Sequence, residues 1–282
     1  MKLLKYLPLL SVGLILVACS FSVNIPSIDT STTHELVISQ PIPENASEPS
    51  LALEMGGGKL NITGGSSKMV EGTVLYNVDD WKPTISATDD SVLISQDHST
   101  NVGIPTGNIK NDWSLKLGSV PMSLRISAGA YAGTLNLSGL SLTNLEISDG
   151  ASQATVRFDS LNPVTMQRFV YKTGASSVNL VGLGNANASQ IDFESGAGNY
   201  TLDFTGAQSK GINAKISSGL SQVKVIVPKN AHAIVNLEGG LSNVDAEGTW
   251  MMQDSKFEAG DSGPIITINV QMAVGNLVLQ QK

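Results

Sequence analysis

Acidic side chains are the groups in this chain that come nearest to a catalytic arrangement. Asp192, Glu194 and Asp203 stand in segments where polar residues alternate with apolar ones such as Phe193 and Leu202. This alternation predicts β-strands, so we expect the three carboxylates to point outward. Carboxylates on one outer face of a β-stack can bind calcium or transfer protons to a carbohydrate. We favour a solvated surface instead, because no neighbouring segment adds an acidic or basic column that would complete a site.

Other catalytic and metal-binding patterns are weak. His34, His98 and His232 are far apart, and no histidine or cysteine stands at metal-ligand spacing from any of them, so we expect each to be a solvated residue. The chain has no G-x-S-x-G motif, and the triple glycine at 56–58 lacks the following Lys-Ser or Lys-Thr of a phosphate-binding loop. We therefore predict no catalytic residue, no metal and no cofactor, and we expect that the protein is not an enzyme.

Cys19 is the only cysteine, and its surroundings predict a covalent modification. Lys2 and Lys5 precede an apolar run over residues 6–17, which is shorter than the roughly 20 residues of a membrane-spanning helix. The run ends in Leu-Val-Ala-Cys at 16–19, which resembles a lipobox, where a signal peptide is cut before a cysteine that receives lipid. We predict a signal peptide at 1–18 and a lipid on Cys19 that anchors the protein outside the cytoplasm, at the outer face of the membrane or in the cell envelope. A simple secretory signal, or a cytosolic protein with an apolar start, is the alternative.

The negative net charge of the chain limits which partners it can bind. Removal of Lys2 and Lys5 with the signal lowers the basic residues from 17 to 15 against 24 acidic ones, so the net charge goes from −7 to −9. Nucleic acid is excluded as a partner on this ground, because phosphate binding needs clustered lysine and arginine. Residues 19–48 are rich in Ser, Thr, Pro and Asn and are expected to form a flexible tether behind the lipidated cysteine.

An internal repeat of about 22 residues organises the rest of the chain. Its six glycines are 21, 24, 22, 23 and 21 residues apart: Gly129, Gly150, Gly174, Gly196, Gly219 and Gly240. Large apolar or β-favouring residues stand three positions before these glycines, and mostly apolar residues stand six and eight positions after them. The residue directly after each glycine is alanine or leucine. Four columns that agree across six units are evidence of one repeated structural unit.

The repeat predicts an all-β solenoid. We expect each unit to hold two short strands, with the glycine permitting a bend that a Cβ would hinder. One unit cannot bury its apolar face, whereas stacked units can. We expect a cap region at 49–120, and the repeats with closing strands at 121–282, the last strand within 265–279 ending the stack. A β-sandwich with regular hairpins is the alternative, although its turns are normally spaced by 8–12 residues without such columns.

Several segments carry a family resemblance. The runs at 56–65 (GGGKLNITGG), 81–83 (WKP), 182–186 (GLGNA), 200–206 (YTLDFTG) and 275–277 (GNL) resemble the toast-rack domains of bacterial envelope proteins. Similar domains form the extracytoplasmic part of membrane proteins in the cell-wall-active antibiotic response. The resemblance covers nearly all of residues 50–282 and implies a β-solenoid in the envelope, and it brings no catalytic motif.

A polar column gives the only candidate binding face. Five positions after the repeat glycines stand Thr134, Thr155, Asn179 and Thr201, continued less regularly by Lys224 and Asp245. Three positions after them stand Ala132, Gln153, Ser177, Asn199, Gln222 and Asn243. Stacking would align these side chains in a strip able to hydrogen-bond a glycan or an extended envelope protein. Ladders of Thr and Asn that only stabilise the stack explain the same pattern.

Three functions fit the sequence. We expect a non-catalytic binding or scaffolding module near the outer face of the membrane, linked to envelope maintenance or stress response. A structural or adhesive solenoid is the second possibility, and a carbohydrate-active enzyme with an acidic face is the third. The first two are favoured because titratable groups do not converge on one place.

Replacing the lipidated cysteine tests the anchor. Cys19→Ala should release the protein from the membrane fraction, because the lipid is the only membrane-inserting group that remains after the signal is removed. Fractionation of cells that make the variant measures this. Wild-type yield of the variant in the membrane pellet would show that no lipid on Cys19 holds the protein there.

Overall fold

The computed structural model describes residues 27–96, 104–106, 108–208 and 210–282. Cys19, the signal peptide and His98 lie outside the described residues. The described part is built from β-strands with one short 3-10 helix, η1 (Asp79–Trp81). No helix in these ranges is long and apolar enough to cross a membrane. The strands of the first half are β1 (Ser27–Asp29), β2 (His34–Gln40), β3 (Ser50–Ser66), β4 (Val70–Tyr76), β5 (Thr84–Ala87), β6 (Ser91–Ser95), β7 (Ile104–Thr106), β8 (Asn111–Gly118) and β9 (Met122–Asn136). Those of the second half are β10 (Leu142–Arg157), β11 (Met166–Val181), β12 (Ala188–Asp203), β13 (Ile212–Val227), β14 (His232–Glu238), β15 (Leu241–Glu247), β16 (Met251–Gln253), β17 (Lys256–Ala259) and β18 (Ile265–Gln281).

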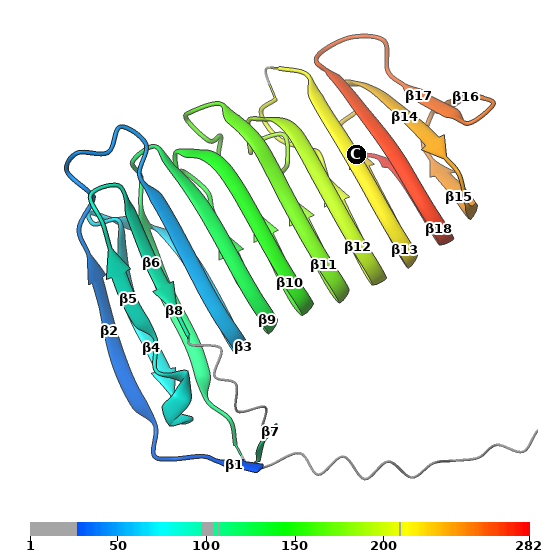
Figure 1. Cartoon of the computed structure of the whole chain (residues 1–282). Coiled ribbons are helices and arrows are strands. Elements are labelled where there is room, and N and C mark those ends of the chain that lie inside the picture. Colours follow the sequence, from blue (N-terminus) through cyan, green and yellow to red (C-terminus); the bar gives the residue numbers. More distant parts are fainter. Residues whose placement is uncertain (1–26, 97–103, 107, 209) are drawn as a thin grey trace, which may run out of the picture.

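Long parallel strands form the body of the molecule. Strands β3, β9 to β13 and β18 are each 15 to 17 residues long and lie side by side as the rungs of one stack (Figure 1). The two short strands expected in each unit are one continuous strand in β9 to β13, whereas the unit around Gly240 has two, β14 and β15. Each strand bends near its middle and turns back behind itself, so that its two halves form two layers.

The core lies between the two halves of the rungs. The apolar column three positions before the glycines is buried, with Ile147 and Ile216 0% exposed and Tyr171 1% exposed. The column six positions after them is buried as far as Val225, as Leu180 and Leu202 show at 0%, and ends at Ala246, which is exposed. Both halves therefore turn alternate side chains inward, as the two-residue period of a strand requires. The solenoid expected from the repeat is confirmed.

The glycines form a column at the bend. Rung pairing places Gly150 beside Gly129 and Gly196 beside Gly174, because the residues on either side of them are register partners. A Cβ on Gly196 would lie 2.6 Å from the carbonyl oxygen of Gly174, and one on Gly219 would lie 2.5 Å from that of Gly196. A Cβ this close to a backbone atom would force the chain to shift, so glycine lets these bends stack at strand spacing, although β18 carries Ala273 at the same position of the column. The leucine after Gly219 lies on the outer edge of the bend, where Leu220 is 65% exposed.

Spatial order departs from chain order at both ends. At the C-terminal end, β18 pairs with β13 on one side and with β14 and β15 on the other. The expectation that 265–279 closes the stack is therefore wrong, and Ala273 separates Gly219 from Gly240 in the column. The end is formed by β14 and β15, with the antiparallel strands β17 and β16 continuing from β14.

At the N-terminal end, β3 pairs directly with β9 and brings Gly56 beside Gly129. Strands β6 and β5 extend the first half of β3, and β8, β4 and β2 extend the second half. Part of the expected tether at 19–48 is ordered, because β2 lies within it and pairs with β4 along its whole length. Trp113 is fully buried in β8, where its Nε1 donates to Asn111 Oδ1 at 3.0 Å.

The glycine column predicts a position-dependent cost of adding one methyl group. Gly196→Ala should lower the free energy of unfolding by about 1–3 kcal/mol, because the new Cβ overlaps the Gly174 carbonyl. Gly56→Ala is the matched control, since a Cβ at this end of the column meets nothing within 4 Å and should be neutral or slightly stabilising. Urea unfolding of both variants measures the difference. Equal losses would mean that backbone flexibility, rather than close stacking, selects glycine.

Candidate binding face

The four predicted strip residues lie in one row. Asn179 is the register partner of Thr155 on one side and of Thr201 on the other, and Thr155 is in turn the partner of Thr134. Thr134 and Asn179 are exposed, and Thr155 and Thr201 are half-buried. Adjacent members of such a row are about 4.8 Å apart. The structure thus brings these residues together as the sequence predicted, while any ligand remains to be tested.

A second polar row runs beside the first. Gln153, Ser177 and Asn199 are register partners on successive rungs and all are exposed. Beyond Gln222 the row continues through β18, where Asn243 Nδ2 donates to Asn276 Oδ1 at 3.0 Å. The first row does not continue in the same way. Lys224 is followed there by Val278, which is 8% exposed and separates it from Asp245.

Hydrogen bonds within the strip are sparse in the described residues. Thr134 N donates to Asn61 Oδ1 at 3.3 Å, but no side-chain hydrogen bond joins Thr155, Asn179 and Thr201 to one another. A ladder that only stabilises the stack would use these groups internally. Their donors and acceptors are instead available to solvent or to a bound molecule.

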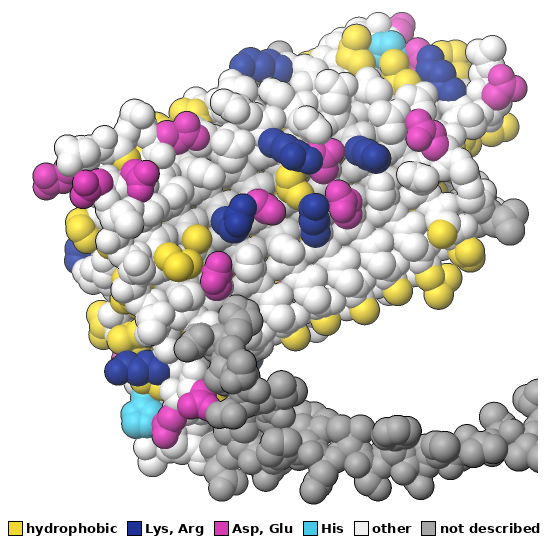
Figure 2. Space-filling model, viewed as in Figure 1, with side chains coloured by type: hydrophobic (Ala, Val, Ile, Leu, Met, Phe, Trp, Pro, Cys, Tyr) yellow, Lys and Arg dark blue, Asp and Glu magenta, His cyan; other side chains and the backbone are white. Residues whose placement is uncertain are grey.

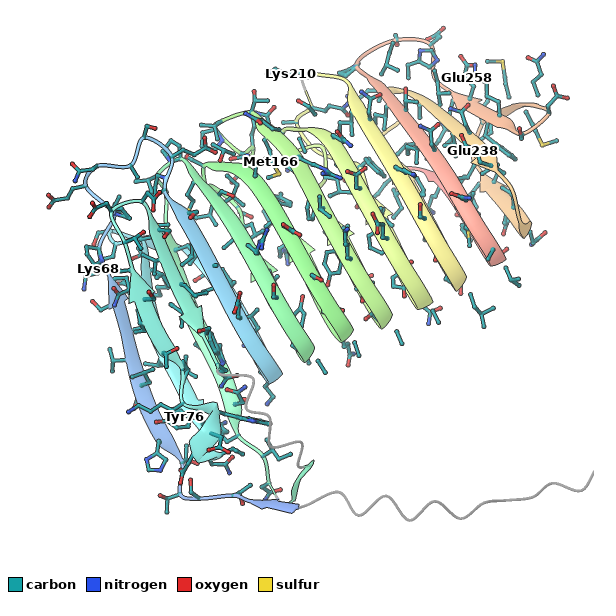
Figure 3. The ribbon with its side chains drawn as sticks, in the orientation of Figure 1. Lys68, Tyr76, Met166, Lys210, Glu238 and Glu258 are labelled. Atoms are coloured by element: carbon teal, nitrogen blue, oxygen red, sulfur yellow. The ribbon has the colours of Figure 1, made fainter. Side chains whose placement is uncertain are left out.

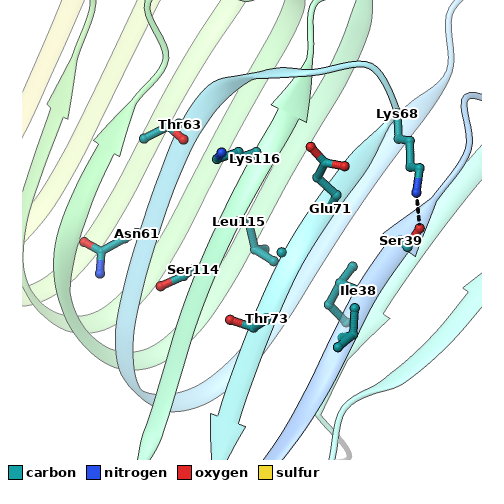
Figure 4. A pocket seen from close by; sticks show the side chains of 12 residues that line it. Ile38, Ser39, Asn61, Thr63, Lys68, Glu71, Thr73, Ser114, Leu115 and Lys116 are labelled. Carbon is teal, nitrogen blue, oxygen red and sulfur yellow. Dashed lines mark hydrogen bonds between the residues drawn. The ribbon is translucent and has the colours of Figure 1, made fainter.

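An open groove lies where the strip reaches the N-terminal end of the stack. The row of Thr134 continues through Asn61, Ser114 and Thr73 to Val37, so it crosses β3, β8, β4 and β2. These strands line a groove of about 570 Å³, and Figure 4 shows the side chains along it.

Charged groups line one side of this groove. Lys116 and Glu71 are register partners, and Lys68 Nζ lies 2.5 Å from Ser39 Oγ (Figure 4). Val37 is 66% exposed and gives the groove an apolar patch. Sequence reasoning missed the groove because its antiparallel strands do not share the repeat spacing. The alternation of apolar and polar residues over 70–76 was the one sequence signal that could have predicted a strand there.

The comparisons with known proteins agree with this architecture. The model described as the N-terminal domain of toast_rack, DUF2154, matches residues 26–168. The chain belongs to the toast-rack family. This membership confirms the resemblance seen in the sequence.

Two solved structures are similar in fold to the toast-rack chain. One is a candidate cell adhesion protein from Clostridium sporogenes, with a TM-score of 0.47, 20% identity and coverage of 89% of this chain and 99% of that chain. The other is a candidate adhesin from Bacteroides fragilis, with a TM-score of 0.40, 12% identity and the same coverage. No curated protein matches the sequence significantly.

Of the three acidic residues that the sequence predicted to be outward, only Glu194 is exposed in the toast-rack domain. Asp192 is only 7% exposed, because Arg168 Nε lies 2.7 Å from its Oδ2. Glu194 pairs with Lys172 at 3.7 Å, so neighbouring rungs do supply a basic column. Figure 2 shows such mixed positive and negative side chains across the front strands. Asp203 lies in the other half of β12, is 7% exposed and accepts a hydrogen bond from Thr205 N at 2.8 Å.

The two described histidines differ in their surroundings. His34 is an exposed residue of β2, as expected, with its Nε2 3.7 Å from Asp79. His232 begins β14 with its Nε2 2.7 Å from Glu258 Oε1, so it is a partly buried hydrogen-bond partner rather than a solvated residue. This histidine and Lys256 hold the pKa of Glu258 below its usual value, with the Lys256 hydrogen bond contributing most.

A buried polar cluster inside the bend was also missed. Tyr171 Oη donates to Asp149 Oδ2 at 2.9 Å and lies 3.2 Å from Tyr131 Oη, and the Asp149 carboxylate also accepts from Thr173 and Ser176. Burial raises the pKa of Tyr131 and of Tyr171 well above the ordinary value for tyrosine. Tyr171 is 1% exposed, and Asp149 is 8% exposed. Because the tyrosines are enclosed and hydrogen-bonded, we interpret the cluster as stabilising the bend.

The raised tyrosine pKa values predict alkaline unfolding. In the unfolded chain these phenols ionise from about pH 10, whereas the folded domain keeps them neutral. The contribution of the two neutral tyrosines to the free energy of unfolding is therefore fully present below pH 10. Above pH 10 it falls by up to about 1.4 kcal/mol per pH unit for each tyrosine. Tyr171→Phe should lower stability by about 1 kcal/mol at pH 8, because one hydrogen bond to Asp149 is lost. The same variant should show a shallower decline above pH 10. Urea midpoints from pH 8 to 11.5 measure this, and parallel curves for both proteins would exclude Tyr171 as a source of the decline.

Proposed function

We propose that this toast-rack protein is a non-catalytic binding module of the bacterial cell envelope, held at the outer face of the membrane by lipid on Cys19. The observation that carries the proposal is the continuity of the polar strip with the groove at the N-terminal end. A molecule bound in the groove can extend along the strip without leaving the same face of the sheet.

The geometry favours an elongated, hydroxyl-rich partner. From Asn61 to Lys224 the row crosses six rungs, a length of about 24 Å at strand spacing. The strip lies on a sheet face, where backbone groups are already paired within the sheet, so recognition there depends on side-chain hydroxyl and amide groups. Such groups suit the hydroxyls of a glycan strand, and an extended envelope protein is the alternative partner.

The chemistry of the described residues supports binding rather than catalysis. The carboxylates that the sequence offered as an acidic face are paired with Arg168 and Lys172 or enclosed like Asp203. The groups with the largest pKa changes, Tyr131 and Tyr171, are buried in the bend. The resemblance to extracytoplasmic domains of the cell-wall-active antibiotic response supports a role in envelope maintenance or stress.

Charge introduced into the strip tests the binding face. The double substitution Thr155→Lys and Asn179→Lys should weaken sedimentation of the full-length, detergent-solubilised protein with purified peptidoglycan by about tenfold, because bulky cations displace two neighbouring hydrogen-bonding groups. Its melting temperature should stay unchanged, since surface substitutions usually cost less than about 0.5 kcal/mol.

The control variant has two serine-to-lysine substitutions, which add the same charge, but on the other half of the rungs. Ser127 and Ser148 are register partners there, so Ser127→Lys with Ser148→Lys should bind peptidoglycan like the wild type. Equal binding by all three proteins would remove the strip as the binding surface. If the wild type does not sediment with peptidoglycan, the glycan assignment is wrong, and capture from solubilised envelopes with the same variants tests the protein partner.

A further inference from the structure

The last rung of the stack is covered along only half of its length. Strand β14 pairs with β18 on one side and with β17 on the other. Strand β15, which continues the same rung after the bend, pairs with β18 alone among the described residues. Its second edge therefore has no strand partner among the described residues, although the Glu247 carbonyl oxygen accepts a hydrogen bond from Trp250 Nε1 at 3.2 Å. An edge of this kind is a template for another strand.

The rows of buried apolar side chains are also less well covered beside this edge. Val244 continues the row of Leu277 and Val223, which are 0% exposed, yet Val244 is only half-buried. Ala246 continues the equally buried row of Leu279 and is exposed. Interior positions of the repeat thus lack at this end the next layer that covers them elsewhere.

A cavity of about 800 Å³ opens next to the edge. It is lined from β14, β15 and β18 by Leu237, Val244 and Leu277, and from the β16–β17 hairpin by Phe257 and Met252. Met252 is 71% exposed, and its neighbour Met251 is 65% exposed. Methionines at the rim of an apolar cavity can adjust to the shape of an incoming side chain.

The outward side chains of β15 are acidic and have no cation beside them. Asp245 and Glu247 have Val278 and Gln280 as register partners, and Gln280 Nε2 donates to Glu247 at 2.8 Å. No ion pair within the described ranges involves either carboxylate. Elsewhere the sheet pairs such groups across rungs, as Arg125 with Glu146 at 3.1 Å and Arg168 with Asp192 at 2.7 Å. The remaining place for a cation is the strand position beyond the edge.

We propose that β15 accepts one extended strand of a partner protein, in which apolar and basic residues alternate. Its apolar side chains enter the cavity beside Val244, its lysine or arginine residues pair with Asp245 and Glu247, and its backbone completes the hydrogen bonds of the edge. Glu238, at the same end of the molecule in Figure 3, adds to the negative charge there, whereas Glu258 is paired with Lys256 at 2.7 Å.

A second copy of the chain fits this edge less well. Strand β15 (LSNVDAE) contains no lysine or arginine, so pairing with itself leaves Asp245 and Glu247 without a cation. Strand β2 (HELVISQ), the edge at the opposite end of the stack, has none either. Charge complementarity therefore points to a different, basic partner strand.

Binding of synthetic peptides to the full-length protein in detergent tests the proposal. The probe is a fluorescent nine-residue peptide in which lysine and valine alternate, followed by anisotropy. Its controls are a peptide with glutamate in place of lysine and a peptide of the same composition with the valines in one block. Only the alternating lysine peptide should bind, because the cavity and the carboxylates face alternate positions of a strand.

Matched variants separate the edge from general charge. Asp245→Lys with Glu247→Lys should weaken binding of the alternating lysine peptide by about tenfold or more. Glu44→Lys with Asp89→Lys makes the same charge change on exposed residues near the other end of the stack, and should leave binding unchanged. Thr155→Lys with Asn179→Lys should also leave it unchanged, which keeps this site distinct from the polar strip. If the lysine pair prevents folding, Asp245→Asn with Glu247→Gln, which should weaken binding by a smaller factor, decides instead.

Several outcomes would overturn the proposal. These are no binding of the alternating lysine peptide, equal binding of the block peptide, or equal weakening by the edge and far-end variants. Analytical ultracentrifugation of the wild-type protein tests whether a second copy of the chain occupies the edge instead. A concentration-dependent dimer that Asp245→Lys with Glu247→Lys converts to monomer would assign the edge to a second copy of the chain.

Discussion

Close approach of backbone to backbone at the bend is the constraint on which this structure depends. Rungs β9 to β13 each turn back at a glycine, and a Cβ there would overlap the carbonyl oxygen of the glycine in the preceding rung, as at Gly196 and Gly174. Strand β18, which carries Ala273 at this position, is the exception. Along β9 to β13 the missing atom allows the bends to stack at strand spacing. Once they stack, the register on both sides of the bend is fixed. A slip of one residue would exchange the inward Leu202 with the outward Thr201, so the buried rows and the polar strip have a common origin.

Regular register explains why electrostatic pairs here join rungs. An arginine side chain is long enough to reach a carboxylate on the next rung even diagonally, as Arg168, whose register partner is Gln190, reaches Asp192. The pairing removes Asp192 from solvent, and it explains why an acidic surface suggested by sequence alternation is neutralised in the fold. The same geometry identifies places where the pairing is incomplete, because a carboxylate such as Asp245 has one neighbour fixed and the other side open.

The repeat predicted local order well and global order less well. Glycine spacing placed β9 to β13 in their true sequence, and it predicted which residues share the rows of Ile147, Leu180 and Thr155. The insertion of β18 between β13 and β15 could not be read from spacing, because the segment carries Ala273 where the other rungs carry glycine. The pairing of β2 with β4 was hidden for a related reason. The serine- and proline-rich composition around 34–40 resembles a tether, although alternation within that segment is enough for an edge strand.

The two ends of the stack differ in the strands that cover the second half of the last rung. At the N-terminal end, β8, β4 and β2 continue that half and enclose the groove beside Asn61. At the C-terminal end, the continuation stops at β15, and its apolar row ends at a half-buried Val244. The repeat therefore supplies the same inner and outer rows to both ends, but only the N-terminal end has additional strands over the second half. A stack of identical rungs becomes directional in this way, with a polar groove at one end and an open apolar edge at the other.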